Sequence, residues 1–231
     1  MTRPPLIFDI DPGFLDDERL SAQMRLVVGL VGNDGGVRRE HLPTEWVGYE
    51  DALALRLNQL IAEMRLRGEA TPEPVPLTEE SVIWPAIESE SLETQLTYLQ
   101  QRREQGHQGR IRLPRNDHEL WASYKYSILA RNHQSYTRFG QRVAARSIPY
   151  RQLWLALVHA SHVAPRPGGI RNALQHMWGY VSNRSQVDPQ RGALMDLLGE
   201  IQRLARDEQV SYLINSTALG ELAVWSRLEG H

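Results

Sequence analysis

Apolar side chains recur three or four positions apart along most of the chain, and this spacing limits the possible folds more than any other feature. Residues at this spacing share one face of an α-helix. No stretch of useful length alternates apolar and polar residues, as a half-buried strand would. The sequence therefore predicts an all-α protein. The spacing is clear in two N-terminal segments, at Leu20, Met24, Val27 and Leu30 and again at Leu53, Leu57, Leu60, Ile61 and Met64.

Turn and capping residues mark where the expected helices begin and end. Asp16 stands before the first helix, and Gly68 follows the second. The prolines of Thr71–Pro76 disfavour helix and predict an extended linker. Asn116 and Glu119 have the spacing of a capping box at the start of a later helix. Further helices are expected at residues 91–104, 134–146, 150–162, 169–183, 190–207 and 209–228.

We expect two domains packed on one another, a helical domain at residues 1–110 and a helical bundle at residues 111–231. A chain of 231 residues is long enough for both to have a hydrophobic core. The absence of cysteine excludes disulfides and thiolate metal ligands. Because no apolar run is long enough to span a membrane and the N-terminus lacks a signal-peptide pattern, we expect a cytoplasmic protein without a membrane partner.

Charge is distributed unevenly, although the net charge is only −2. Residues 102–191 contain 15 basic and 4 acidic residues, a net of +11, and the rest contain 11 basic and 24 acidic, a net of −13. Arginines that neutralise phosphates supply most of the non-specific affinity for nucleic acids. Aromatic residues such as Trp121, Tyr136 and Phe139 lie among these arginines. The pattern indicates a nucleic-acid-binding half; the alternative is a solvated surface paired with the acidic half.

The chain has 25 arginines and a single lysine, Lys125, which lies between Tyr124 and Tyr126. Lysine can lose its proton when buried and then act as a nucleophile, which arginine cannot do. Lys125 is therefore a candidate for amine chemistry. The alternative is an ordinary half-exposed helical residue.

Three N-terminal motifs follow one another in order, Phe8–Asp16, Leu20–Arg25 and Leu60–Gly68. Through them the chain resembles the endonuclease V-type pyrimidine-dimer DNA glycosylases from Leu6 to about Gly68, with a fainter continuation to Tyr126. The resemblance implies helices that grip damaged duplex DNA. It also implies a nucleophilic N-terminal amine, that of Thr2 once Met1 is removed, which attacks the sugar C1′ to form a Schiff base.

The chain departs from this family at the catalytic glutamate. In the segment Ser21–Leu26, which corresponds to the family's catalytic helix, Arg25 matches but Leu26 occupies the position of the glutamate. A leucine side chain cannot transfer a proton or stabilise a cationic sugar. Lys125 is an alternative amine nucleophile, and Asp9 and Asp11 are alternative carboxylates.

Two further motifs, Leu120–Asn132 and Arg171–Tyr180, lie in the C-terminal half. Through them the chain resembles the YbgA-like domain family, whose biochemical role is unresolved, from about His118 to Trp225. Because a role in holding tRNA has been suggested for some members, the resemblance implies contact with a nucleic acid without distinguishing DNA from RNA.

A polar stripe is expected on the helix of the second motif, because its residues recur at helical spacing. It is either a binding site or a polar seam between helices. Its members are Asn172, Gln175, His176, Gly179 and Tyr180. We interpret His159, His162 and His176 as packing or hydrogen-bonding residues, and we expect neither a metal nor another cofactor.

The sequence favours a nucleic-acid-binding protein of DNA-repair type, with DNA preferred over RNA, that recognises damaged or distorted DNA. It leaves open glycosylase/AP-lyase activity through Lys125 or Thr2, and it does not give the oligomeric state. The alternatives are a tRNA-binding module without catalysis and a small-molecule enzyme centred on Lys125 and His176. The expected nucleic-acid contacts are Arg25, Arg110, Arg112, Arg115, Tyr124, Tyr126, Arg131, Arg171, Asn172, Gln175, His176 and Tyr180.

Overall fold

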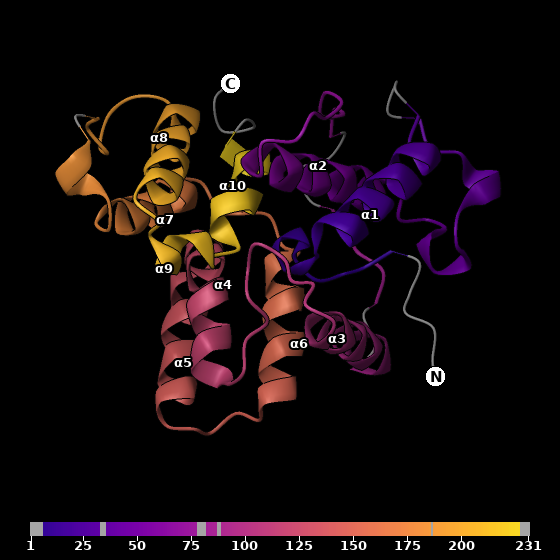
Figure 1. The fold of residues 1–231 in the computed structure, drawn as a ribbon, viewed down its shortest axis with the longest axis horizontal. Helices are drawn as coiled ribbons and strands as arrows, with labels where there is room; N and C mark the ends of the chain where they lie inside the picture. The colour runs from indigo at the N-terminus through magenta and orange to yellow at the C-terminus, as the bar shows by residue number, and fades with distance from the viewer. Residues whose placement is uncertain (1–6, 33–35, 78–81, 87–88, 186, 227–231) are drawn as a thin grey trace. The chain divides into compact units, whose positions relative to one another are not determined.

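The computed structural model describes residues 7–32, 36–77, 82–86, 89–185 and 187–226 and confirms the all-α fold (Figure 1). Within these ranges the extended structure amounts to one isolated bridge between Val31 and Val37. Contacts divide the chain into two compact units, residues 1–113 and 114–231. The division lies three residues beyond the expected boundary because residues 111–113 pack with the first unit, where Ile111 N donates to Gly13 O. No helix of the described residues is both long and apolar enough to cross a membrane.

The first unit is built around helices α1 and α2, which pack along each other (Figure 1). Asp16 caps α1, because its side chain accepts a hydrogen bond from Arg19 N. The same carboxylate accepts two hydrogen bonds from Arg102 of α3, from Nε at 2.9 Å and from Nη2 at 3.0 Å. The elements are η1 (Pro12–Phe14), α1 (Asp17–Leu30), η2 (Arg39–His41), η3 (Thr44–Trp46), α2 (Glu50–Leu66) and α3 (Ser89–Glu104).

The loop after α3 crosses the turn before α1 at very short range. A Cβ added to Gly109 would lie 2.4 Å from Gly13 O and 2.7 Å from Leu15 O. A glycine is therefore required where the two backbones cross. This crossing fixes the segment that carries Arg110 and Ile111 against the start of the first unit.

The second unit is a helical bundle around α4, which contacts α5, α6, α7 and α10 (Figure 1). A Cβ on Gly169 would lie 2.0 Å from Ala130 O, so the start of α7 packs directly on the backbone of α4. The elements are α4 (Asp117–Arg131), α5 (His133–Ala144), α6 (Tyr150–Ser161), α7 (Gly169–Trp178), η4 (Ser182–Arg184), α8 (Leu194–Asp207), α9 (Ser211–Ile214) and α10 (Ala218–Ser226).

Two details differ from the sequence-based expectations. The helix expected at residues 209–228 is broken between α9 and α10, because Thr217 turns to α4 and donates through its backbone N to Ser123 O at 2.9 Å. The capping box at α4 is also incomplete. The Asn116 side chain accepts a hydrogen bond from Glu119 N, as expected. The Glu119 carboxylate accepts its hydrogen bond from the backbone N of Arg115, one residue before the N-cap.

Candidate nucleic-acid interface

Helix α1 presents Arg25 to solvent and buries the opposite face, which carries Leu20, Met24 and Val27. Leu26, next to Arg25, is half-buried. Gln23 is buried and its Oε1 accepts a hydrogen bond from Phe8 N at 2.9 Å, so this residue holds the N-terminal segment on α1. The centre of α1 therefore offers a cation to an anionic partner, but the position expected for a catalytic carboxylate is apolar.

The two alternative carboxylates of the first unit, those of Asp9 and Asp11, accept hydrogen bonds from nearby residues. Asp9 Oδ2 accepts a hydrogen bond from Gln95 Nε2 at 2.7 Å. Asp11 Oδ1 accepts one from Gly13 N at 2.8 Å and so caps η1. Both carboxylates shape the turn before α1. Thr2 lies outside the described residues.

Arg110 lies inside the first unit, where it forms an ion pair with Glu63. Arg110 Nε and Nη2 contact the Glu63 carboxylate at 2.9 and 2.7 Å, and Arg67 Nε reaches the same carboxylate at 2.8 Å. Burial opposes ionisation of Glu63, but the two guanidinium groups outweigh it and hold its pKa below the ordinary value. Arg110 is accordingly a structural residue in this arrangement, and its side chain does not face solvent.

Lys125 is half-buried and its ammonium lies against two aromatic rings. Lys125 Nζ is 4.7 Å from the ring centre of Tyr126 and 4.8 Å from that of Tyr212. These distances are typical of cation–π contacts made by a charged ammonium. The geometry thus gives Lys125 a role in packing against these two rings.

Three other expected contacts are buried in the second unit. Tyr124 and Tyr126 face its core. Arg131 forms a two-fold ion pair with Glu221 at 2.8 and 2.9 Å and also donates to the carbonyl oxygen of Ser127. A buried ion pair of this kind is satisfied internally. These residues support the bundle.

The polar stripe, which runs past the end of α7 to Gly179 and Tyr180, and the neighbouring Arg171 are divided between the two roles that the sequence left open. Arg171 donates to Gly192 O at 2.9 Å, and Gln175 donates to Gln190 Oε1 at 2.9 Å, so both hold the loop before α8. Asn172, His176 and Tyr180 are exposed. The first pair forms a polar seam, whereas the other three present a surface to solvent.

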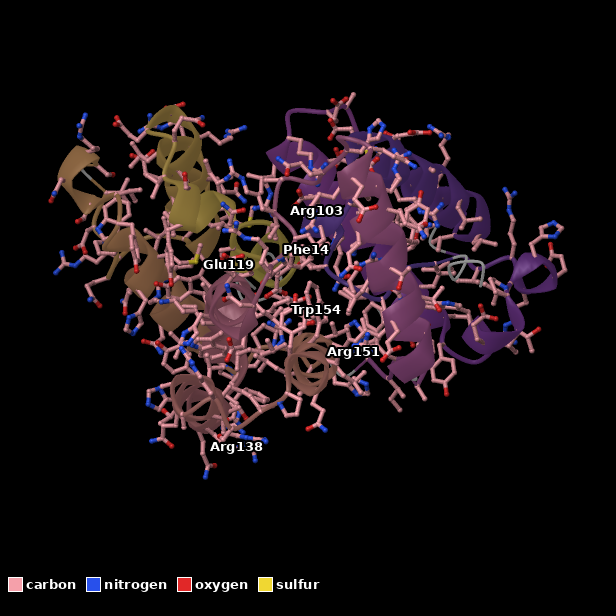
Figure 2. All side chains as sticks on the ribbon, turned by 60° about the horizontal axis from the view of Figure 1, so that its bottom comes forward. Phe14, Arg103, Glu119, Arg138, Arg151 and Trp154 are labelled. Carbon is pink, nitrogen blue, oxygen red and sulfur yellow. The ribbon has the colours of Figure 1, made fainter. Side chains whose placement is uncertain are left out.

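The structure also shows three exposed arginines that were not among the expected nucleic-acid contacts. Arg138 and Arg142 lie four residues apart on α5, and Arg146 lies just beyond the end of this helix; all three are exposed. None of them forms an ion pair with an acidic residue of the described ranges. Figure 2 shows Arg138 extending from α5 away from the rest of the bundle. We call Arg138, Arg142 and Arg146 the α5 arginines.

The sequence on either side of the α5 arginines is rich in basic residues and has no acidic residue. The 68 residues from Leu120 to Val187 contain nine basic residues and no aspartate or glutamate. By contrast, Arg115 pairs with Glu119 at 2.9 Å, and Arg184 pairs with Glu208 at 3.3 Å. Arg112 is exposed in the loop before α4. The four-residue spacing of the α5 arginines was the sequence signal for this surface.

The described residues do not form an obvious site for a metal or a small molecule. No group of three or more histidine or acidic residues among them is arranged to hold a metal ion. A hollow in the first unit, bordered by Phe14, Arg103 and His107, has a volume of about 10 Å³, which is about the space of one water molecule. Small-molecule sites commonly measure about 300–1,000 Å³. An extended cationic surface is therefore the more informative feature.

Comparison with known proteins identifies part of the chain. Residues 6–75 match the family model of the pyrimidine dimer DNA glycosylases. The match confirms the expected resemblance of the N-terminal part and supports a function of DNA-repair type. Neither a curated protein nor a solved structure matched the chain. The resemblance of the C-terminal part to the YbgA-like domain stays a prediction.

Proposed function

We propose that this protein binds damaged or distorted duplex DNA and does not use the carboxylate chemistry of the glycosylase family. The observation that carries the proposal is α1, which lies within the family match, keeps the exposed Arg25 and has Leu26 beside it. An arginine can contact a phosphate or an opened base step. Leucine at position 26 leaves that contact intact but removes the proton-transferring group.

The α5 arginines support the same function from the second unit. Sequence-independent affinity for DNA comes mainly from cationic side chains that neutralise phosphates. Exposed arginines without acidic partners are suited to this role because no internal ion pair must be broken on binding. We therefore assign general duplex affinity to the α5 arginines and damage recognition to the α1 surface.

Replacing Arg25 with alanine should lower the affinity for a duplex with one abasic site about tenfold, because a charge-assisted contact is lost. The affinity for the undamaged duplex should change less. Fluorescence anisotropy with matched labelled duplexes measures both. The control is Arg39→Ala, since Arg39 is 78% exposed in the same unit but is paired with Glu50 at 3.0 Å. Equal losses on both duplexes, or tighter binding of tRNA than of either duplex, would contradict the proposal.

Borohydride trapping on abasic and UV-irradiated duplexes tests the absence of Schiff-base chemistry. We expect wild type, Lys125→Arg and an N-terminally blocked protein to bind DNA without forming a covalent adduct. Arginine keeps a cation over the rings of Tyr126 and Tyr212 but cannot form a Schiff base. An adduct lost only in Lys125→Arg would identify a lysine-dependent lyase. An adduct lost only after blocking would identify the amine of Thr2 as the nucleophile.

A further inference from the structure

Tyr180 is held rigidly at the surface of the second unit. It is 47% exposed, yet its ring is stacked on that of Tyr212, with the ring centres 4.9 Å apart and an angle of 21° between the planes. A ring that is stacked on one side and still about half exposed presents its other side to solvent. An exposed, immobilised aromatic ring suits stacking on another flat ring.

The support beneath Tyr180 comes from distant parts of the chain. The ring centres of Tyr126, from α4, and Tyr212, from α9, lie 6.3 Å apart, and the Tyr212 ring in turn stacks on Tyr180. Burial, reinforced by the neighbouring side chain of Tyr180, raises the pKa of Tyr126 above its ordinary value, so its hydroxyl stays neutral. Lys125 Nζ covers the rings of Tyr126 and Tyr212. These contacts fix the orientation of the Tyr180 ring before any ligand arrives.

Two exposed hydrogen-bonding side chains stand on α7, the helix that precedes Tyr180. Asn172, His176 and Tyr180 are four residues apart, and the first two are on the solvent face of α7. The side chains of Asn172 and His176 make no hydrogen bond within the described part of the chain. An amide can recognise a base edge, and an imidazole can contact a base or a phosphate. The surrounding sequence, Leu120 to Val187, has no acidic residue that would repel a phosphate.

We propose that Tyr180 is a stacking platform for an unpaired base of single-stranded DNA, with Asn172 and His176 on the solvent face of α7 as hydrogen-bonding partners. Unpaired bases stack on aromatic side chains, and a nearby positive surface binds the backbone. Tyr126, Tyr212 and Lys125 act as positioning residues, because they contact Tyr180 or its support. The site lies within the second unit and does not depend on damage recognition by the first.

The test is binding of a labelled oligothymidylate, with Tyr180→Ala and Tyr180→Phe compared with wild type. Alanine should weaken binding about tenfold because it removes the stacking ring. Phenylalanine should stay within about threefold of wild type because it keeps the ring. Val163→Ala, at a position 60% exposed in the same unit, is the control. Circular dichroism melting establishes that each variant is folded.

Three outcomes would overturn the proposal. One is a folded Tyr180→Ala protein that binds oligothymidylate as tightly as wild type. Another is an equal loss in Tyr180→Phe, which would assign the effect to the hydroxyl group. The last is a protein that binds oligouridylate through Tyr180 but does not bind oligothymidylate, which would make RNA, and not DNA, the ligand of this site. Because the probe is undamaged and single-stranded, failure here leaves the proposed recognition of damaged duplex untouched.

For the positioning residues, Lys125→Met should weaken oligothymidylate binding, and Lys125→Arg should restore it. Arginine can again place a cation over the rings of Tyr126 and Tyr212, whereas methionine cannot. The rescue separates positioning through charge from simple filling of space. Equal binding by the methionine and arginine variants would remove Lys125 from the proposed site.

Discussion

Replacing Arg138, Arg142 and Arg146 together with glutamine should weaken binding to undamaged duplex DNA on the order of a hundredfold at low salt. The three side chains are exposed and lack acidic partners among the described residues, so each is available to a phosphate. Each phosphate contact releases counterions and adds about 0.9 to the slope of log K against log salt. The slope should therefore fall by roughly 2.7 in the triple variant. Anisotropy titrations across a salt series measure both quantities.

A second triple variant separates a local effect from a change in total charge. Arg115, Arg184 and Arg203 are also exposed, but they pair with Glu119, Glu208 and Glu200, respectively. Changing them to glutamine removes the same three charges. We expect a change of less than about threefold, because exposed ion pairs contribute little and are already compensated. Equal losses in both triple variants would show that net charge, and not the surface of α5, controls binding.

Replacing Glu63 with glutamine should destabilise the first unit by about 3–5 kcal/mol, because it leaves Arg67 and Arg110 without their buried carboxylate. That is a large share of the roughly 5–15 kcal/mol that stabilises a typical domain. The matched control is Asp17→Asn. Asp17 also contacts Arg67 at 2.8 Å, but its side chain is 90% exposed, so about 1 kcal/mol or less is expected. Hydrogen exchange of peptides from residues 7–113, followed by mass spectrometry, reports on this unit separately. Similar losses in both variants would contradict the assigned role of burial.

The same carboxylate predicts how the stability of the first unit depends on pH. The pKa of Glu63 is lower in the folded protein than in the unfolded chain, whose ordinary value is about 4.3. The stability that ionised Glu63 contributes to the first unit is therefore complete above the unfolded-state pKa. It is lost as the pH falls through the folded-state pKa. Acid should destabilise wild type more steeply than Glu63→Gln, and urea melts between about pH 6 and pH 3 compare the two.

The sequence predicts the elements of this fold better than their contacts. Apolar spacing and caps locate α1, α2 and most helices of the bundle, because these signals are local. The pairing of Glu63 with Arg110 joins residues 47 positions apart, and periodicity carries no information about it. For this reason Arg110 was expected at the surface and lies inside.

The aromatic cluster shows the same limit. Tyr126 and Tyr180 could be singled out from their motifs, but Tyr212 stands in a segment without any comparable signal. Its position follows from the break between α9 and α10, which tertiary hydrogen bonds of Thr217 impose on a helical pattern. The exposed α5 arginines, by contrast, were visible in the sequence as a four-residue repeat in a stretch without acidic residues.

The buried pair of Arg131 and Glu221 has a consequence for synthesis on the ribosome. The contacts within the first unit join residues up to Leu113, so none of them has to wait for the rest of the chain to be made. The second unit must wait, because Arg131 meets its carboxylate only after another 90 residues have been translated. A nascent chain arrested before α10 would hold an uncompensated guanidinium at the centre of an unfinished bundle. Such a product is a natural substrate for chaperones and proteases.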